Sequence, residues 1–225
     1  MDQRQKEKIN DLFLCYFEQK RERGEMQQIY YGQLMTQVPS EPEFLETWMQ
    51  IVTQYAPRFT MDEVSLIEKV LKYDYKGFYK CVDTYDSMLK ALVVAGEAFI
   101  PLIFSHLFSL IAPLPEEDQE PTPNEHPSLV SLDFQELTAE WIAEHCTHII
   151  IEIARNYPSY TPHLIKPLKK FFPHKSFSEQ AHQLYVEAIL LISEAFEGVR
   201  DTIIALVVNK MLAVDIDIQL DLGEE

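Results

Sequence analysis

Glycine is scarce in this chain, which has six glycines among 225 residues. β-Sandwiches and β-barrels depend on turns, and many turns require the positive φ that glycine adopts most readily. The many runs of leucine, isoleucine, alanine and glutamate are instead typical of helices. Hydrophobic residues make up 47% of the chain, which is enough for a continuous core. We therefore predict an all-α fold.

Cysteine and long apolar runs are also lacking. The three cysteines, Cys15, Cys81 and Cys146, are odd in number and far apart in the sequence. This excludes a paired disulfide framework and a CxxC metal or redox motif, and it favours a reducing compartment. No apolar run approaches the roughly 18 residues that a membrane span requires. We expect a soluble intracellular protein without a membrane partner.

Basic residues are few relative to acidic ones. The chain has 19 lysines and arginines against 36 aspartates and glutamates, a formal net charge of −17. Such a field repels phosphate backbones, so we expect no direct nucleic-acid binding by this segment. Two interpretations of the acidity remain open: a well-solvated surface, and an interface that attracts its partner by charge.

Apolar residues recur at helical spacing through most of the chain. The pattern predicts helices over 2–22, 25–36, 41–55, 84–95, 99–111, 137–157 and about 200–213. Local capping signals predict further helix starts. These signals are Thr60-x-x-Glu63, Ser176-x-x-Glu179, and Thr161 followed by Pro162 at the first helical position.

Two apolar positions recur 39 residues further along the chain. Leu164 is matched by Ile203 and Leu168 by Val207, and an earlier copy has Ile103 and Leu107. A period near 40 residues is the length of two antiparallel helices with their turns, the HEAT-type unit. Such units bury their apolar faces by stacking on their neighbours. We predict a HEAT-type α-solenoid of stacked antiparallel helix pairs, forming a single domain over residues 1–225.

Residues 113–133 interrupt this pattern with an acidic, proline-rich segment. We predict a solvated loop inserted between repeats. The last predicted helix is followed by acidic residues and not by a polar capping repeat. We therefore expect the chain to be the N-terminal fragment of a longer protein.

Motifs for catalysis or metal binding are weak. His145, Cys146 and His148 are close in sequence, but no second pair of ligands follows them. Glu179 and His182 have the spacing of half a di-iron site, whose second half is missing. Walker-type, GxSxG and GxGxxG motifs are absent. We predict no enzymatic activity, no cofactor and no metal, and an α-helical enzyme is the least favoured alternative.

The stretch from Ile153 to Ser178 has a positive net charge, opposite to that of the whole chain, because it contains no aspartate or glutamate. Its basic residues are Arg155, Lys166, Lys169, Lys170 and Lys175. Lys166, Lys169 and Lys170 have the spacing of one helix face. That face has three interpretations: an ordinary solvated surface, a partner-binding surface and a nucleic-acid site. The partner-binding surface is our functional hypothesis.

Thr161 and Pro162 also have two interpretations. Thr161 is well suited to cap a helix that Pro162 begins. The same dipeptide is a target for proline-directed kinases, and a phosphate beside Lys166 would compete with an acidic partner. Thr161 is therefore a candidate for regulatory phosphorylation.

One string of residues in the second half of the chain has the form of a known family. It consists of Cys146, Ile150 to Arg155, Pro158-Ser159, Thr161-Pro162, Leu164, Pro167, Phe172-Pro173, Tyr185-Val186, Leu190 to Ser193, Arg200, Ile203-Ile204, Lys210 to Leu212 and Asp215. Upstream of it, Phe99 to Pro113 is followed by the acidic segment. In these features the chain resembles the RNA polymerase I-specific transcription initiation factor family, also called transcription initiation factor IA, and the strongest similarity covers residues 146–218.

This resemblance implies a HEAT-repeat protein that binds RNA polymerase I and bridges it to the promoter-bound core factor at ribosomal RNA genes. It implies a location in the nucleus and nucleolus, and it is compatible with a homodimer. The polymerase face would include the basic residues and a serine-bearing surface with Ser105 and Ser109; Ser159, Ser176 and Ser178 are further candidates, although capping explains Ser176 and Ser178 equally well. The alternative function is that of an unrelated HEAT-repeat adaptor, for example in nuclear transport or as a complex scaffold.

Overall fold

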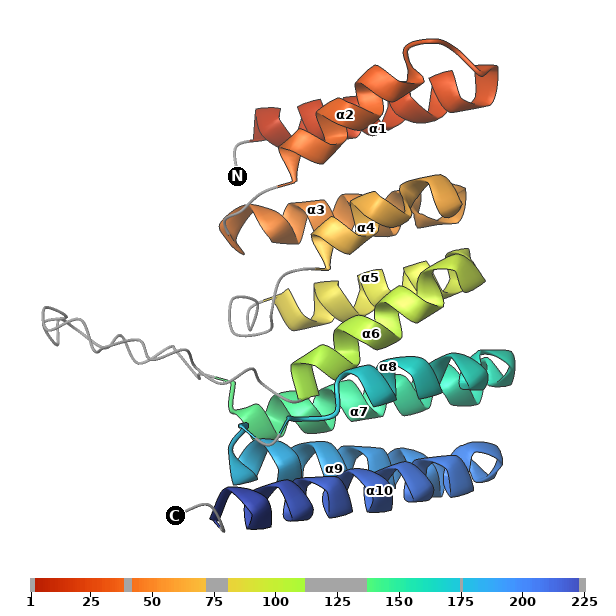
Figure 1. Ribbon diagram of the computed structural model, residues 1–225. Helices are drawn as coiled ribbons and strands as arrows, with labels where there is room; N and C mark the ends of the chain where they lie inside the picture. Colours follow the sequence, from red (N-terminus) through yellow and green to blue (C-terminus); the bar gives the residue numbers. More distant parts are fainter. Residues whose placement is uncertain (1–2, 39–41, 72–80, 112–136, 175, 223–225) are drawn as a thin grey trace, which may run out of the picture. The chain divides into compact units, whose positions relative to one another are not determined.

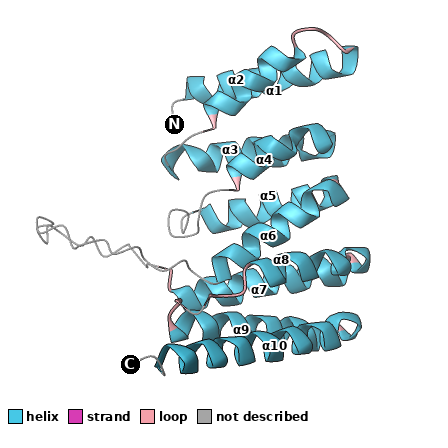
Figure 2. Ribbon diagram, in the orientation of Figure 1, coloured by secondary structure: helices cyan, strands magenta, loops and turns pink. Residues whose placement is uncertain are grey.

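The described residues form helices and the turns next to them, as Figures 1 and 2 show. The computed structural model describes residues 3–38, 42–71, 81–111, 137–174 and 176–222. Its α-helices are α1 Gln3–Glu22, α2 Gln27–Gln37, α3 Pro42–Tyr55, α4 Val64–Val70, α5 Val82–Ala95, α6 Ile100–Ile111, α7 Ala139–Asn156, α8 Ile165–Lys170, α9 Glu179–Ala195 and α10 Glu197–Leu222. The predicted all-α class is confirmed. None of the described helices is long and apolar enough to cross a membrane.

Two compact units make up the chain: unit 1, Met1–His106, and unit 2, Leu107–Glu225. The boundary falls within α6, and each unit is described by itself. A single domain over residues 1–225 stays a prediction. The acidic segment 113–133 lies outside the described residues.

Unit 1 has an aromatic core. α1 packs against α2, and α3 packs against α5. Phe13 of α1 is fully buried and stacks on Tyr55 of α3, with ring centroids 5.0 Å apart. Trp48 meets the edge of the same Phe13 ring at 5.7 Å. Phe17 stacks on Tyr55 at 5.6 Å, so the rings join the first helix to the third.

A buried carboxylate also joins α1 to the segment that begins α4. Glu63 is fully buried. It accepts hydrogen bonds from the Tyr16 hydroxyl, from Lys20 Nζ at 2.6 Å and from the Thr60 backbone N–H at 2.6 Å. Lys20 also contacts Asp62, with Nζ 3.0 Å from the carboxylate. We call Tyr16, Lys20, Thr60, Asp62 and Glu63 the Glu63 cluster; the predicted capping box of Thr60 and Glu63 is confirmed within it.

The Glu63 cluster shifts the pKa values of its members. Burial opposes the charged form of Lys20, but its hydrogen bonds to Glu63 and Asp62 outweigh burial and raise its pKa. Burial, followed by the Glu63 carboxylate, raises the pKa of Tyr16. The hydrogen bond from Lys20 lowers the pKa of Asp62. Lys20 is therefore held as a cation and Tyr16 as a neutral donor, which is the protonation that a buried carboxylate requires.

Unit 2 has a mainly aliphatic core. α9 packs against both α7 and α10. Leu164, Leu168 and Ile203, three members of the 39-residue repeat, are fully buried, whereas Val207 is half-buried. Tyr185 of α9 is also fully buried and donates its hydroxyl hydrogen to the Leu168 carbonyl at 2.8 Å. This bond fixes the end of α8 to α9.

The start of α9 differs from the prediction. We expected a capping box between Ser176 and Glu179, but the capping residue is Ser178, whose hydroxyl accepts from the Ala181 N–H at 3.2 Å. Ser176 instead contacts the His174 ring, with Oγ 3.1 Å from Nδ1. The two serines are two residues apart, and the ring of His174 draws the first one away from the helix.

Candidate partner-binding surface

Prolines shape the acid-free stretch of unit 2. α7 ends at Asn156, and a 3-10 helix from Pro158 to Leu164 leads directly into α8. Pro158 starts this 3-10 helix, so Pro162 lies inside it. The expected helix start at Thr161 is therefore wrong, because the first proline of the stretch already begins the turn. Thr161 does not cap a helix, and its side chain is half-exposed.

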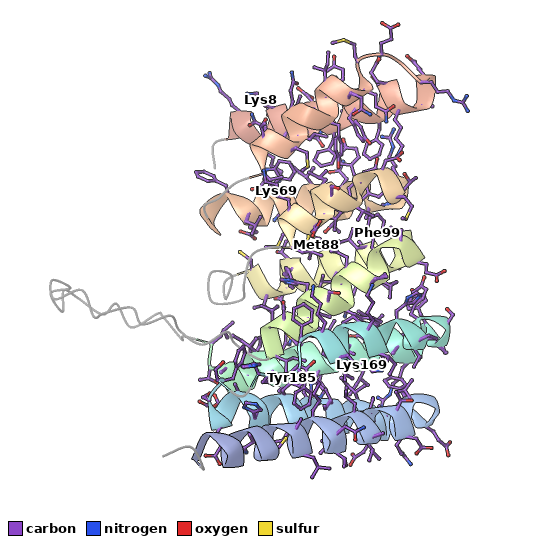
Figure 3. The ribbon with its side chains drawn as sticks, in the orientation of Figure 1. Lys8, Lys69, Met88, Phe99, Lys169 and Tyr185 are labelled. Atoms are coloured by element: carbon purple, nitrogen blue, oxygen red, sulfur yellow. The ribbon has the colours of Figure 1, made fainter. Side chains whose placement is uncertain are left out.

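The short helix α8 separates its apolar and basic side chains. Leu164, just before α8, and Leu168 within it are fully buried, whereas Lys166, Lys169 and Lys170 are exposed. Lys169 is labelled on α8 in Figure 3. The predicted i, i+3, i+4 face thus exists, and we call these three residues the α8 lysine face. Their role in binding stays a prediction.

The described cations of this stretch pair with no described carboxylate. Among the described residues, Arg155, Lys166 and Lys169 form no ion pair and no hydrogen bond. Lys170 lies over the Phe171 ring, with Nζ 4.8 Å from the ring centroid. The dipole of α8 favours cations in its last turn and so accounts for Lys169 and Lys170, but not for Lys166 near its start. The helix dipole therefore does not explain why all three positions of α8 carry a lysine.

The remaining predicted residues of the polymerase face lie apart from α8 in sequence. Arg155 is exposed in the last turn of α7. Ser105 and Ser109 are half-buried on α6, Ser105 in unit 1 and Ser109 in unit 2. Lys175 lies outside the described residues.

The side chains that suggested a metal site or a catalytic site do not converge on one point among the described residues. Cys146 is buried in the core of α7, whereas His148 on the same helix is exposed. His145 stacks on Trp141, with ring centroids 4.5 Å apart. The part of the chain that the structure describes holds no cluster of three such ligands. His182 faces its own helix start, with Nδ1 3.0 Å from the Ser178 carbonyl oxygen.

The sequence alone did not predict the Glu63 cluster. Its Thr60-x-x-Glu63 signal was visible, but Lys20 is 43 residues away from Glu63. A partial signal existed, because Tyr16 and Lys20 are four residues apart and share a face of α1. Only the fold shows that this face meets the carboxylate. The fold therefore separates Lys20, which has carboxylate partners, from the lysines of α8, which pair with no carboxylate among the described residues.

Known proteins share this architecture. The helix pairs define an α-helical protein of the HEAT-like class. A solved structure described as the crystal structure of RNA polymerase I transcription initiation factor Rrn3 has the same fold, with a TM-score of 0.66 and 15% sequence identity. The similarity covers 96% of this chain and 41% of that chain. The chain thus spans about two-fifths of the length of that protein.

The sequence itself identifies the family. Residues 7–225 match the family described as RNA polymerase I specific transcription initiation factor RRN3. The chain belongs to this family, which confirms the resemblance of residues 146–218. The family consists of transcription initiation factors and not of enzymes, so the expected absence of catalysis agrees with it. No curated protein matches the chain.

Proposed function

We propose that this chain acts in transcription initiation by RNA polymerase I, by binding that polymerase. The match of residues 7–225 to the initiation factor family is the observation that carries the proposal. The HEAT-like fold supports it, because stacked helix pairs offer long exposed faces to protein partners. An unrelated helical adaptor would not explain the family match.

A pull-down from nuclear extract tests this function. The tagged chain should retain subunits of RNA polymerase I and not those of RNA polymerase II. Retention of neither polymerase, with the chain folded by circular dichroism, would contradict the proposal. Equal retention of both would also contradict it, since the family is specific for polymerase I.

The basic residues are the first candidates for the polymerase contact. Arg155, Lys166, Lys169 and Lys170 are exposed, and no acidic side chain interrupts their stretch. Lys175, Ser105 and Ser109 belong to the same proposal. In the pull-down, K166E/K169E/K170E should reduce retention of polymerase I, and retention equal to that of the native chain would remove this face from the proposal.

Thr161 is proposed as a regulatory phosphorylation site of the same surface. It is half-exposed, makes no capping bond and lies five residues before Lys166. A phosphate there would bring about two negative charges to the basic stretch. Thr161→Glu should lower polymerase retention and Thr161→Ala should not. Mass spectrometry of the native protein that finds Thr161 unmodified in every growth condition would count against the site.

Bridging to the promoter-bound core factor, a nuclear and nucleolar location and homodimer formation complete the proposed function. The family match supports the nuclear location, and the other three are proposals without a supporting observation. Adding purified core factor to the polymerase-bound chain tests the bridge, because a bridging chain retains both partners on one resin. Light scattering of the purified chain gives its oligomeric state.

A further inference from the structure

Several basic side chains elsewhere in the fold have internal partners. Lys20 binds Glu63, and Lys69 donates to the Met35 carbonyl at 2.6 Å. Arg58 lies over the Phe17 ring, 4.5 Å from its centroid. Arg200 donates to the Ser193 carbonyl at 3.3 Å. Among the described residues, the α8 lysine face has no such carboxylate or carbonyl partner, and it lies in the longest stretch of the sequence that has no acidic residue.

We infer that the α8 lysine face binds an acidic peptide segment of a partner protein. The inference rests on the proposed function for the identity of that partner, but the chemistry of the contact follows from the face itself. Exposed ammonium groups without internal carboxylates are free to pair with carboxylates supplied from outside.

The spacing of the lysines favours an extended acidic segment. A helix rises about 1.5 Å per residue, so Lys166 and Lys170 are separated by about 6 Å along the axis. In an extended chain, alternate residues point to the same side and lie roughly 6.5 to 7 Å apart. Two glutamates separated by one residue therefore match the ends of the α8 lysine face.

The charge around the face favours a peptide over a nucleic acid. The acid-free stretch is bounded by Glu152 and Glu179, which are both exposed. A nucleic acid would extend past these carboxylates into a chain of net charge −17, whereas a short peptide would not. At physiological ionic strength, charges more than about 8 Å away are largely screened, so a short segment responds mainly to the local lysines.

Aromatic rings in the same stretch add apolar area to a contact that ion pairs alone would make weakly. Tyr157 and Tyr160 are half-exposed and stack with ring centroids 5.4 Å apart. Phe171 is also half-exposed, beneath Lys170. Tyrosine is enriched among the residues that dominate protein interfaces. We therefore expect the acidic segment to be followed or preceded by apolar side chains in the natural partner.

Fluorescence anisotropy with a labelled peptide of alternating glutamate and serine tests the inference. The whole chain is titrated at 0.15 M salt, and the peptide with glutamine in place of glutamate is the comparison. K166E/K169E/K170E should weaken binding of the acidic peptide by at least about tenfold. The matched control is R4E/K8E/K210E, because these three side chains are also exposed and unpaired among the described residues. Both triple variants lower the net charge by the same amount.

Each outcome decides the inference. Binding that requires glutamate, that the α8 variant loses and that the control variant keeps supports it. No binding of the acidic peptide, equal loss in both variants, or tighter binding of an oligothymidylate of the same charge would overturn it. The polymerase pull-down is scored separately. Polymerase retention without peptide binding refutes this inference and leaves the proposed function intact. Peptide binding without polymerase retention supports this inference and refutes the proposed function.

Discussion

Unit 1 surrounds the ammonium group of Lys20 with oxygen atoms, whereas unit 2 leaves Lys166, Lys169 and Lys170 facing solvent. Lys20 lies 2.7 Å from the Thr60 hydroxyl and 2.6 Å from the Glu63 carboxylate. Its charge is used to neutralise a carboxylate inside the fold. The charges of α8 neutralise no carboxylate among the described residues. The same side chain therefore contributes to stability in unit 1 and is available for binding in unit 2, and the difference lies in whether a carboxylate is near.

The largest expected effect comes from removing the charge of Lys20. Lys20→Met leaves Glu63 buried without its cation, and breaking a buried pair in this way costs several kcal/mol. Because the Lys20 side chain is 19% exposed, we expect a loss of about 3 kcal/mol in the free energy of unfolding of unit 1. Urea denaturation followed by Trp48 fluorescence, in a Trp141→Phe background, measures it.

The control for this change is Lys8→Met, which removes an exposed lysine of unit 1 without a partner among the described residues. We expect this control to alter stability by less than about 0.5 kcal/mol. A loss below about 1 kcal/mol for Lys20→Met would show that Lys20 is no more important to the fold than a surface lysine. The comparison between the two units would then fail.

The Tyr16 hydroxyl should contribute less than Lys20. Tyr16→Phe removes one neutral donor to Glu63 and keeps the ring in the aromatic core. Hydrogen bonds to charged groups contribute about 1.5 to 3 kcal/mol, so we expect a loss of about 2 kcal/mol from the same fluorescence assay. Tyr31→Phe is the control, since the buried Tyr31 hydroxyl forms no hydrogen bond to Glu63. If Tyr16→Phe and its control lose the same stability, the hydroxyl bond to the carboxylate is not the cause.

Local sequence signals predicted those parts of the fold that depend on neighbouring residues. The capping box at Thr60 and Glu63 formed, because both partners lie within one turn. The exposed face of α8 also formed as predicted, because helical spacing determines which side chains point away from buried Leu164 and Leu168. The sequence also shows that no aspartate or glutamate lies within the stretch from Ile153 to Ser178 that includes this face.

Errors arose where two equivalent signals stood close together. Pro158 and Pro162 could each begin a helix, and the first one did. Ser176 and Ser178 could each cap α9, and the second one did. The partner of Lys20 could not be predicted at all, since it depends on how α1 packs against a segment 43 residues later. Tertiary contacts decide such cases.

A smaller effect tests the corrected start of α9. Ser178→Ala removes the hydroxyl that accepts from the Ala181 N–H, and loss of such a cap costs about 1 kcal/mol. Ser176→Ala is the matched control and should cost less than about 0.3 kcal/mol, because Ser176 is exposed and bonds only within its loop. Urea denaturation followed by Trp141 fluorescence, in a Trp48→Phe background, reports on unit 2. Equal losses of stability, or a larger loss for Ser176→Ala, would instead support the predicted capping box of Ser176 and Glu179.

The smallest effect on stability is expected where the effect on binding is largest. In K166E/K169E/K170E no internal ion pair is broken, so packing gives no reason for a large loss. Two of the new carboxylates lie in the last turn of α8, where the helix dipole disfavours anions by a few tenths of a kcal/mol each. We therefore expect the free energy of unfolding, followed by Trp141 fluorescence, to fall by about 0.5 kcal/mol in total.

The control R4E/K8E/K210E adds the same negative charge and shows how much of any loss comes from general repulsion. A loss above about 2 kcal/mol that the control does not share would mean that the α8 lysines hold unit 2 together. The contrast with Lys20 would then disappear, and reduced binding by the same variant could be attributed to unfolding.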